Sequence, residues 1–248
     1  MATAFFASAA VMLLRNAVKP KTATRGRRGS CRAQRTVVTV VLTGGPCGGK
    51  SSSLAHLSNA LKAQRFNVLT VPEVPTLLMS NGCYFPGIDG DPTQLLTYET
   101  RLVHLQMQLE ATFTALAAVN TASNGWPSVV VCDRGACDTA AYMSPALWAA
   151  TLDRLGTTHA ALLKRYDVVC HLTTAADGAA AHYGSDTNAT RTETAAEACA
   201  ADKRTRESWK DHPMLKVVPN RPGQSFDDKL TEVTAFVVEQ CRRLAPVA

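Results

Sequence analysis

Residues 36–52 read TVVTVVLTGGPCGGKSS, and this stretch decides the fold. The run at 36–42 is a continuous β-branched segment, which is typical of a strand buried on both faces of a parallel sheet. A helix is predicted from about residue 51 to 65, because Leu54, Leu57 and Leu61 recur on one face. A glycine-rich turn joins the two, so the sequence predicts a strand–turn–helix unit.

The turn at residues 44–51 matches the pattern G-x-x-x-x-G-K-[ST] in full. Glycines allow the backbone to wrap closely around phosphate, and the helix that follows directs its positive dipole end at the anion. Lys50 adds a full charge against the β- and γ-phosphates, and the Ser51 hydroxyl is a ligand for Mg²⁺. We therefore predict a P-loop that binds ATP or GTP together with Mg²⁺. The predicted nucleotide-binding residues are Gly44, Gly45, Pro46, Cys47, Gly48, Gly49, Lys50, Ser51 and Ser52.

Strands and helices are predicted to alternate along the rest of the chain. Further strands are expected at 67–71, 128–132, 166–172 and 216–218, and further helices at 92–120, 144–165 and 226–244. This order indicates an α/β protein with a five-stranded parallel sheet and helices on both faces, the three-layer P-loop NTPase fold. Residues 77–91 are expected to form a loop over the active site, and the polar residues 173–211 to form a lid. We predict one domain over residues 37–248.

The first 36 residues have a composition of their own. They contain eight basic side chains and no acidic one, whereas the first carboxylate of the chain is Glu73. The net charge of +6 therefore belongs to this tail, and we expect no nucleic-acid partner for the folded domain. The composition predicts a transit peptide for a plastid or mitochondrion, without which the protein would be cytoplasmic. A secretory or bipartite leader, and a disordered basic arm that contacts anionic lipid or nucleic acid, are the alternatives.

Two carboxylates are predicted at the carboxyl ends of strands, where open parallel sheets bind their ligands. Asp133 follows four apolar residues, as a Walker B acid does, and could order the Mg²⁺ hydration shell or accept a proton. Glu73 could serve as a general base or as a hydrogen-bond partner of a substrate hydroxyl. Arg134 could clamp a phosphate or a substrate. The alternative makes each of them a helix cap or a surface charge, and Asp138 either orients substrate or caps the next helix.

The polar segment between the last two strands is rich in cations, namely Arg191, Lys203, Arg204 and Arg206. A lid at this position would close on bound nucleotide and bring cations to the transferred phosphoryl group. A solvated helix with i,i+4 ion pairs, such as Asp202 with Arg206, would have the same composition.

Taken in order, these motifs resemble a known family. Residues 44–51, the EVPTLL stretch at 73–78, the CDRG stretch at 132–135 and the segment from 191 to 220 are similar to the NadR/TRPL-translocation-defect type of AAA domain. The likeness covers roughly residues 37–244. It implies a fold like that of thymidylate and deoxynucleoside kinases, with a lid. Members of the NadR branch phosphorylate nicotinamide riboside with ATP, and the other branch includes trafficking proteins regarded as nucleotide- and lipid-binding.

The resemblance also implies roles for individual residues. Gly49, Lys50 and Ser51 would bind phosphate and Mg²⁺, Asp133 and Arg134 would form the kinase Asp-Arg site, and Arg191 and Arg204 would be lid cations. The residues after Arg134 are Gly135-Ala136-Cys137 rather than a Ser-Pro type continuation, which favours the second branch.

We predict a small-molecule kinase that transfers the γ-phosphoryl group to a nucleoside-like hydroxyl. Its catalytic residues would be Lys50, Glu73, Asp133, Arg134, Arg191 and Arg204, and its metal ligands Ser51 and Asp133. The alternative is a nucleotide-dependent switch without kinase activity, which binds a protein or a phosphoinositide lipid. A membrane lipid is a partner only under this alternative.

Overall fold

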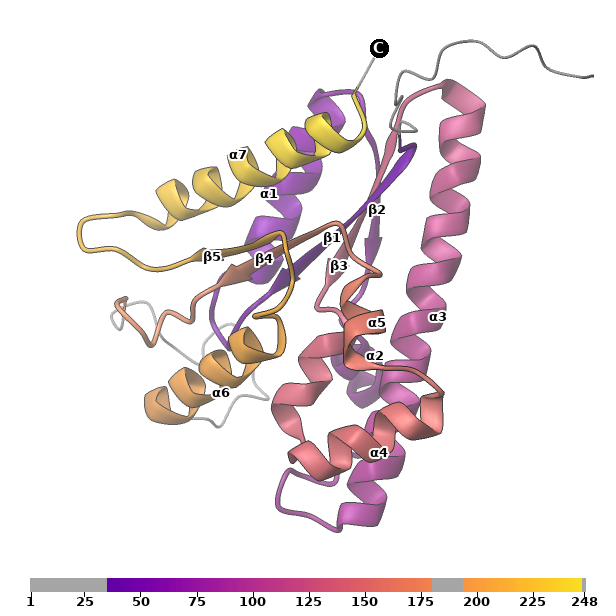
Figure 1. Cartoon of the computed structure of the whole chain (residues 1–248). Helices are drawn as coiled ribbons and strands as arrows, with labels where there is room; N and C mark the ends of the chain where they lie inside the picture. Colours follow the sequence, from indigo (N-terminus) through magenta and orange to yellow (C-terminus); the bar gives the residue numbers. More distant parts are fainter. Residues whose placement is uncertain (1–34, 180–193, 247–248) are drawn as a thin grey trace, which may run out of the picture. The chain divides into compact units, whose positions relative to one another are not determined.

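The computed structural model describes residues 35–179 and 194–246. At its centre lies a five-stranded sheet in the order β2–β3–β1–β4–β5, in which every paired strand is parallel (Figure 1). The strands are β1 (Val37–Thr43), β2 (Asn67–Val71), β3 (Ser128–Asp133), β4 (Val168–Leu172) and β5 (Leu215–Val218). The predicted parallel sheet is confirmed, and the order of its strands places the ends of β2 and β3 next to each other.

Seven α-helices and one short 3₁₀ helix lie between and around these strands in the described residues. They are α1 (Lys50–Ala63), α2 (Val74–Ser80), α3 (Pro92–Asn124), η1 (Ala136–Tyr142), α4 (Pro145–Leu155), α5 (His159–Leu163), α6 (Ala195–Ser208) and α7 (Phe226–Leu244).

Two helix predictions need correction. The single helix expected at 144–165 is divided into α4 and α5, because Gly156 adopts a φ of 62° and ends α4 in a left-handed turn. The Thr158 hydroxyl then accepts a hydrogen bond from the Ala161 amide and caps α5. The expected loop at 77–91 begins as helix α2, which has a proline in its first turn; the irregular segment starts only after it.

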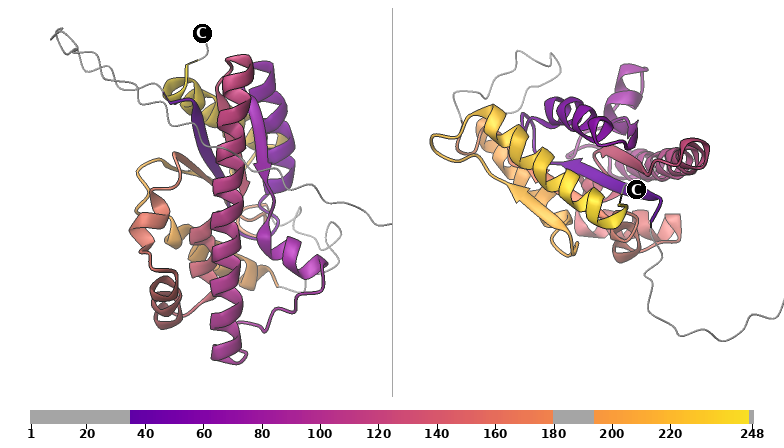
Figure 2. Two further views of the ribbon diagram at one scale, coloured as in Figure 1. Left: turned by 90° about the vertical axis from the view of Figure 1, so that its right-hand side faces the viewer. Right: turned by 90° about the horizontal axis from the view of Figure 1, so that it is seen from above.

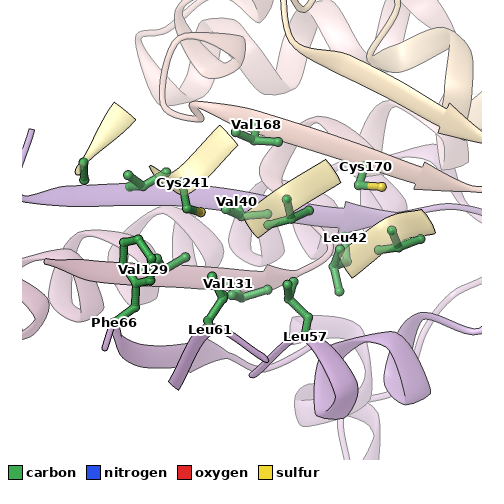
Figure 3. Close-up of a cluster of buried hydrophobic side chains, with 14 of the residues drawn as sticks. Val40, Leu42, Leu57, Leu61, Phe66, Val129, Val131, Val168, Cys170 and Cys241 are labelled. Carbon is green, nitrogen blue, oxygen red and sulfur yellow. The ribbon is translucent and has the colours of Figure 1, made fainter. Parts of the chain in front are cut away.

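One face of the sheet packs against α1 and α7. Alternate side chains of β1, Val38, Val40 and Leu42, are fully buried there and meet Leu57 and Leu61 of α1 (Figure 3). The opposite side chain Val41 points to the other face, which packs against α3, α5 and Trp209. Because both faces are covered, β1 is apolar on both, and the three-layer arrangement is confirmed (Figure 1).

Helix α3 is much longer than the strands, and its first half extends beyond their carboxyl ends (Figures 1 and 2). Asp91 begins this helix, since its side chain accepts a hydrogen bond of 2.7 Å from the Thr93 amide. The buried face of α3 carries polar side chains among its apolar ones. It includes Glu99, Gln106 and Glu110, while Leu116 is 51% exposed. Buried polar side chains on a helix face require partners, which makes this end of α3 relevant to function.

No helix in the described part of the chain has the length and apolar character needed to cross a membrane.

Candidate active site

The turn between β1 and α1 has a backbone that only glycine can adopt at two positions. Gly44 has a φ of 137°, and a Cβ atom there would lie 2.0 Å from the Leu172 carbonyl oxygen. Gly49 has a φ of 87°, and a Cβ atom would lie 2.5 Å from the ring of Phe226. The loop is therefore held tightly between β4 and the first turn of α7.

Two carbonyl groups of this loop are bonded to the segment that follows β4. Pro46 O accepts from the Thr174 hydroxyl at 2.5 Å, and Cys47 O accepts from the Ala175 amide at 3.2 Å. Four successive amides at the start of α1 have no acceptor among the described residues, and they line a cavity. They belong to Gly48, Gly49, Lys50 and Ser51. Unpaired amides at a helix N-terminus form an anion-binding site.

The Lys50 ammonium lies against the middle of the loop. It donates to Gly44 O at 3.1 Å and to Gly45 O at 2.9 Å, which leaves one of its three hydrogens for another acceptor. Burial and the nearby Arg134 guanidinium lower the pKa of Lys50 to about 8, although Glu73 and Asp133 act in the opposite direction. An anion bound at the four amides would stabilise the charged ammonium.

Asp202 of α6 fixes the loop from the side opposite the cavity. Its Oδ1 accepts from the Gly45 amide at 2.8 Å and from the Thr174 amide at 3.1 Å, and its Oδ2 lies 3.1 Å from His171 Nε2. Burial raises the pKa of Asp202, but the hydrogen bonds from His171, Gly45 and Thr174 outweigh it and hold the pKa below its ordinary value. The i,i+4 pair with Arg206 that the sequence suggested is wrong, because Asp202 points inward to the loop.

Asp133 and Ser51 both line the cavity, and their side chains carry oxygen atoms, the kind of ligand that Mg²⁺ prefers. The Asp133 Oδ1 atom is buried and has no hydrogen-bond partner in the described residues. Burial, together with the nearby Glu73 carboxylate, raises the pKa of Asp133. No group of three or more His, Cys, Asp or Glu side chains in the described parts could hold a metal ion. An oxygen-only pair suits Mg²⁺, which takes one or two protein ligands and completes its shell with phosphates and water.

Arg134 and Glu73 form an ion pair across the ends of β2 and β3. Arg134 Nε donates to Glu73 Oε1 at 2.5 Å, and Nη1 donates to Gly44 O at 3.2 Å. The Thr76 hydroxyl donates to the second Glu73 oxygen at 2.5 Å. Burial raises the pKa of Glu73, but Arg134 and Thr76 lower it more, so the carboxylate is ionised at neutral pH. Arg134 adopts a φ of 66°, a conformation that is uncommon outside glycine and directs its side chain into the site.

Asp138 caps η1, which agrees with the second of the two roles predicted for it, substrate orientation or helix capping. It accepts from the Gly135 amide at 2.7 Å and from Trp209 Nε1 at 3.1 Å, and the Thr43 hydroxyl also donates to it. Trp209 falls within the segment 173–211 that was predicted to form a lid, but it is fully buried in the core beneath the site.

A cavity of about 1090 Å³ joins these groups. One end lies at the P-loop and the start of α7 and includes Phe226 and Lys229; the other lies between α2, the first half of α3 and η1. Most of the predicted site residues line it together: Pro46, Cys47, Gly48, Gly49, Lys50, Ser51, Ser52, Glu73, Asp133 and Arg134.

Of the two predicted lid cations, Arg204 is not part of this group. Arg204 Nε donates to the Ala141 carbonyl at 2.8 Å, and its side chain is not among those that line the cavity. Arg191 lies outside the described residues.

Several cavity residues are absent from the sequence prediction. Tyr98, Glu99 and Gln106 come from α3, and Phe226 and Lys229 come from α7. Glu99 and Gln106 are polar residues on the buried face of α3, a signal that can be used only once that face is known. Phe226 and Lys229 carried none, since an aromatic residue and a lysine at the start of an amphipathic helix are ordinary.

The sequence and the fold are both similar to those of known proteins. A family model described as "AAA domain" matches residues 39–224. No curated protein matches the sequence. A similar solved structure is that of the NadR protein in complex with NAD and AMP-PNP, with 11% identity and a TM-score of 0.51. The alignment covers 86% of this chain and 51% of the NadR chain, so the chain spans about half the length of that protein. At this identity the likeness concerns the fold alone.

Proposed function

The chain belongs to the AAA domain family, and on this premise we propose that it is a Mg²⁺-dependent kinase. It would transfer the γ-phosphoryl group of ATP or GTP to a hydroxyl group of a nucleoside-like acceptor. The observation that carries the proposal is the continuity of one cavity, which joins four unpaired loop amides to the carboxylate and guanidinium groups at the ends of β2 and β3. A loop that only stored nucleotide would not need a second compartment of this kind.

The nucleotide half of the cavity would bind the triphosphate. The amides of Gly48, Gly49, Lys50 and Ser51 would donate to the phosphate oxygens, and Lys50 would place its remaining N–H on the β- and γ-phosphates. The similar NadR structure was solved with AMP-PNP, which supports nucleotide binding by this fold.

Ser51 and Asp133 would hold Mg²⁺ with the nucleotide. When bound, the metal neutralises charge on the β- and γ-phosphates. The unpaired Asp133 oxygen supports this assignment, because a buried carboxylate without a partner is unstable unless something compensates its charge.

The acceptor half would orient the hydroxyl group. Glu73 is ionised and lies beside Arg134, so it can accept the hydroxyl proton while Arg134 donates to the phosphoryl oxygens. The hydroxyl oxygen forms a bond to the γ-phosphorus, and the bond between that phosphorus and the β–γ bridging oxygen breaks. The products are the phosphorylated acceptor and ADP or GDP. In such a loose transition state positioning matters more than base strength, so a carboxylate with a low pKa is sufficient.

The proposed phosphoryl transfer uses Lys50, Glu73 and Arg134, and it does not depend on the lid cations. Arg204 would have to leave Ala141 to reach a phosphate. Arg191 remains a predicted lid cation.

A nucleotide-dependent switch is the second candidate function. Four large apolar side chains are exposed on α2 and the segment after it, beside the cavity: Leu77, Met79, Tyr84 and Ile88. Bound nucleotide could order this segment for a protein or phosphoinositide partner, with no phosphoryl transfer.

Turnover measurements separate these candidates. ADP release would be followed with Mg·ATP or Mg·GTP, alone and with each of a set of nucleosides that includes nicotinamide riboside. The kinase proposal predicts that at least one nucleoside stimulates turnover, and that Asp133→Asn cuts this turnover while nucleotide still binds. Tight nucleotide binding with no stimulation by any acceptor would favour the switch.

A further inference from the structure

The carboxyl group of Glu99 has no partner, although the residue is only 3% exposed and lines the cavity. Across residues 35–179 and 194–246, no hydrogen bond or ion pair reaches it, and burial is the cause that raises its pKa to about 8. Glu110 lies on the same helix face and is equally buried, but it accepts from Gln106, Arg165 and Tyr166. Burying an unpaired carboxyl is unfavourable, which indicates that a bound molecule completes its hydrogen bonding.

The surroundings of Glu99 are suited to a ring. The Tyr98 hydroxyl is also buried without a partner in the described residues, and the Tyr98 ring packs on Phe85 with centroids 5.5 Å apart. Phe85, Tyr98 and Leu102 line the same part of the cavity. The pocket therefore combines apolar walls with two unused polar groups, an arrangement typical of small-molecule sites.

The distance from the reacting end fits a molecule with two linked rings. Gln106 Nε2 donates to the Arg134 carbonyl at 3.3 Å, so Gln106 marks the level of the strand ends. Glu99 is seven residues earlier on α3, which places it about 10 Å along the helix axis. A sugar bearing the reactive hydroxyl near Glu73 would leave its base beside Glu99.

The charges at this end disfavour an anionic acceptor. Glu73, Asp133 and Asp138 line it, and Arg134 is already paired with Glu73. A phosphate group carried by the acceptor would meet these carboxylates, while Lys50 and Arg134 would already be engaged by the transferred phosphoryl group.

Building on the proposed kinase activity, we infer that Glu99 is the specificity-determining residue of the acceptor pocket. It accepts hydrogen bonds from an N–H group on the ring of an uncharged or cationic acceptor. Acceptors that already carry a phosphate are excluded. An N–H donor stabilises the carboxylate, and the raised pKa means that this acceptor displaces a proton when it binds at neutral pH.

Calorimetry with the full chain, saturated with Mg·AMP-PNP, tests the inference. The probes are adenosine, cytidine, guanosine and uridine, each compared with its own 3′-monophosphate, whose 5′-hydroxyl is still available. At least one nucleoside should bind more tightly than its monophosphate. Glu99→Gln keeps the size of the side chain and an acceptor oxygen but removes the charge, so it should weaken that binding about tenfold, the difference between a charge-assisted and a neutral hydrogen bond.

Two readouts separate recognition from a structural role. In Glu99→Gln the affinity for AMP-PNP should stay unchanged. The kcat/KM for the acceptor should decrease because KM rises, while kcat stays the same. Glu207→Gln, at an exposed glutamate of α6, is the matched control and should alter neither.

Unchanged nucleoside affinity in Glu99→Gln would overturn the inference, and so would preference for a 3′-monophosphate. Failure of every nucleoside to bind while AMP-PNP still binds would overturn it as well, without touching nucleotide binding. Failure to bind AMP-PNP would instead remove the proposed function and the inference together.

Discussion

The two ends of the cavity are built in opposite ways. At the phosphate end, eight consecutive residues supply the amides and the lysine, and their outward groups are bonded to Thr174, Ala175 and Asp202. At the acceptor end, Glu73, Glu99 and Arg134 come from segments far apart in the chain, and Glu99 has no partner at all in the described residues. The first end is rigid and suited to the one chemical group that every nucleoside triphosphate shares. The second keeps unsatisfied groups, which can distinguish one acceptor from another.

Lys50→Ala should produce the largest effect and is confined to the phosphate end. Turnover should fall by at least about 10² to 10³, because a charged donor to the transferred phosphoryl group is removed. Circular dichroism should show an intact fold, since the Lys50 ammonium contacts only loop carbonyls. If Lys50→Ala kept more than a tenth of the wild-type turnover, the phosphate end of the cavity would not have the role described for it.

Asp202→Ala asks whether the phosphate end depends on α6. The change leaves the Gly45 and Thr174 amides without an acceptor and breaks the contact with buried His171. The free energy of unfolding should fall by about 2–4 kcal/mol, measured by urea denaturation, and the nucleotide KM should rise. Asp211→Ala, at an exposed position just beyond α6, should leave both unchanged. Equal stability of the two variants would show that the loop holds its shape alone.

At the acceptor end, the test is how the free energy of unfolding of the wild type and of Glu99→Gln depends on pH. The folded pKa of about 8 exceeds the ordinary value of 4.5, so the folded state keeps a proton that the unfolded state has lost. The contribution of Glu99 to the free energy of unfolding should therefore fall between pH 4.5 and 8, by an amount on the order of 5 kcal/mol, and then level off. The variant does not titrate there, so its stability relative to wild type should increase across the same window. Parallel curves for the two proteins would contradict the burial of an unpaired carboxyl.

The smallest effect concerns the pH dependence of nucleotide affinity. Burial and Arg134 lower the pKa of Lys50 to about 8, and bound triphosphate should restore its charge. Affinity should then decline above pH 8, by at most about tenfold per pH unit, because a proton must be taken up on binding. Calorimetry from pH 7 to 9.5 measures this, and Lys50→Ala should show no such decline.

The sequence predicted the phosphate end in detail because its information is local. An apolar strand, a glycine turn and a helix are adjacent in the chain, and the neighbouring ends of β2 and β3 follow from the rule for open parallel sheets. The acceptor end was only partly predictable. Glu73 and Arg134 were recognised as separate groups, yet their ion pair depends on the order of the strands. Glu99 was missed because it is conspicuous only when the length of α3 and the identity of its buried face are known.

Asp202 and His171 illustrate the same limit. Asp202 lies on α6, within the segment predicted to be the lid, and His171 lies on β4. Asp202 contacts both His171 and Gly45 only because α6 packs against the loop. One of the two interpretations of the sequence placed Asp202 on a solvated helix, where its i,i+4 neighbour Arg206 is the nearest candidate partner. Tertiary packing overrode that local preference.

The account rests most directly on the binding of a nucleoside triphosphate at the loop amides. Calorimetric titration of residues 37–248 with ATP and with GTP, in Mg²⁺ and in EDTA, measures this binding. We predict magnesium-dependent uptake of at least one of the two at a stoichiometry near one, strongly weakened in Lys50→Ala. A folded protein that takes up neither nucleotide in the presence of Mg²⁺ would contradict the account.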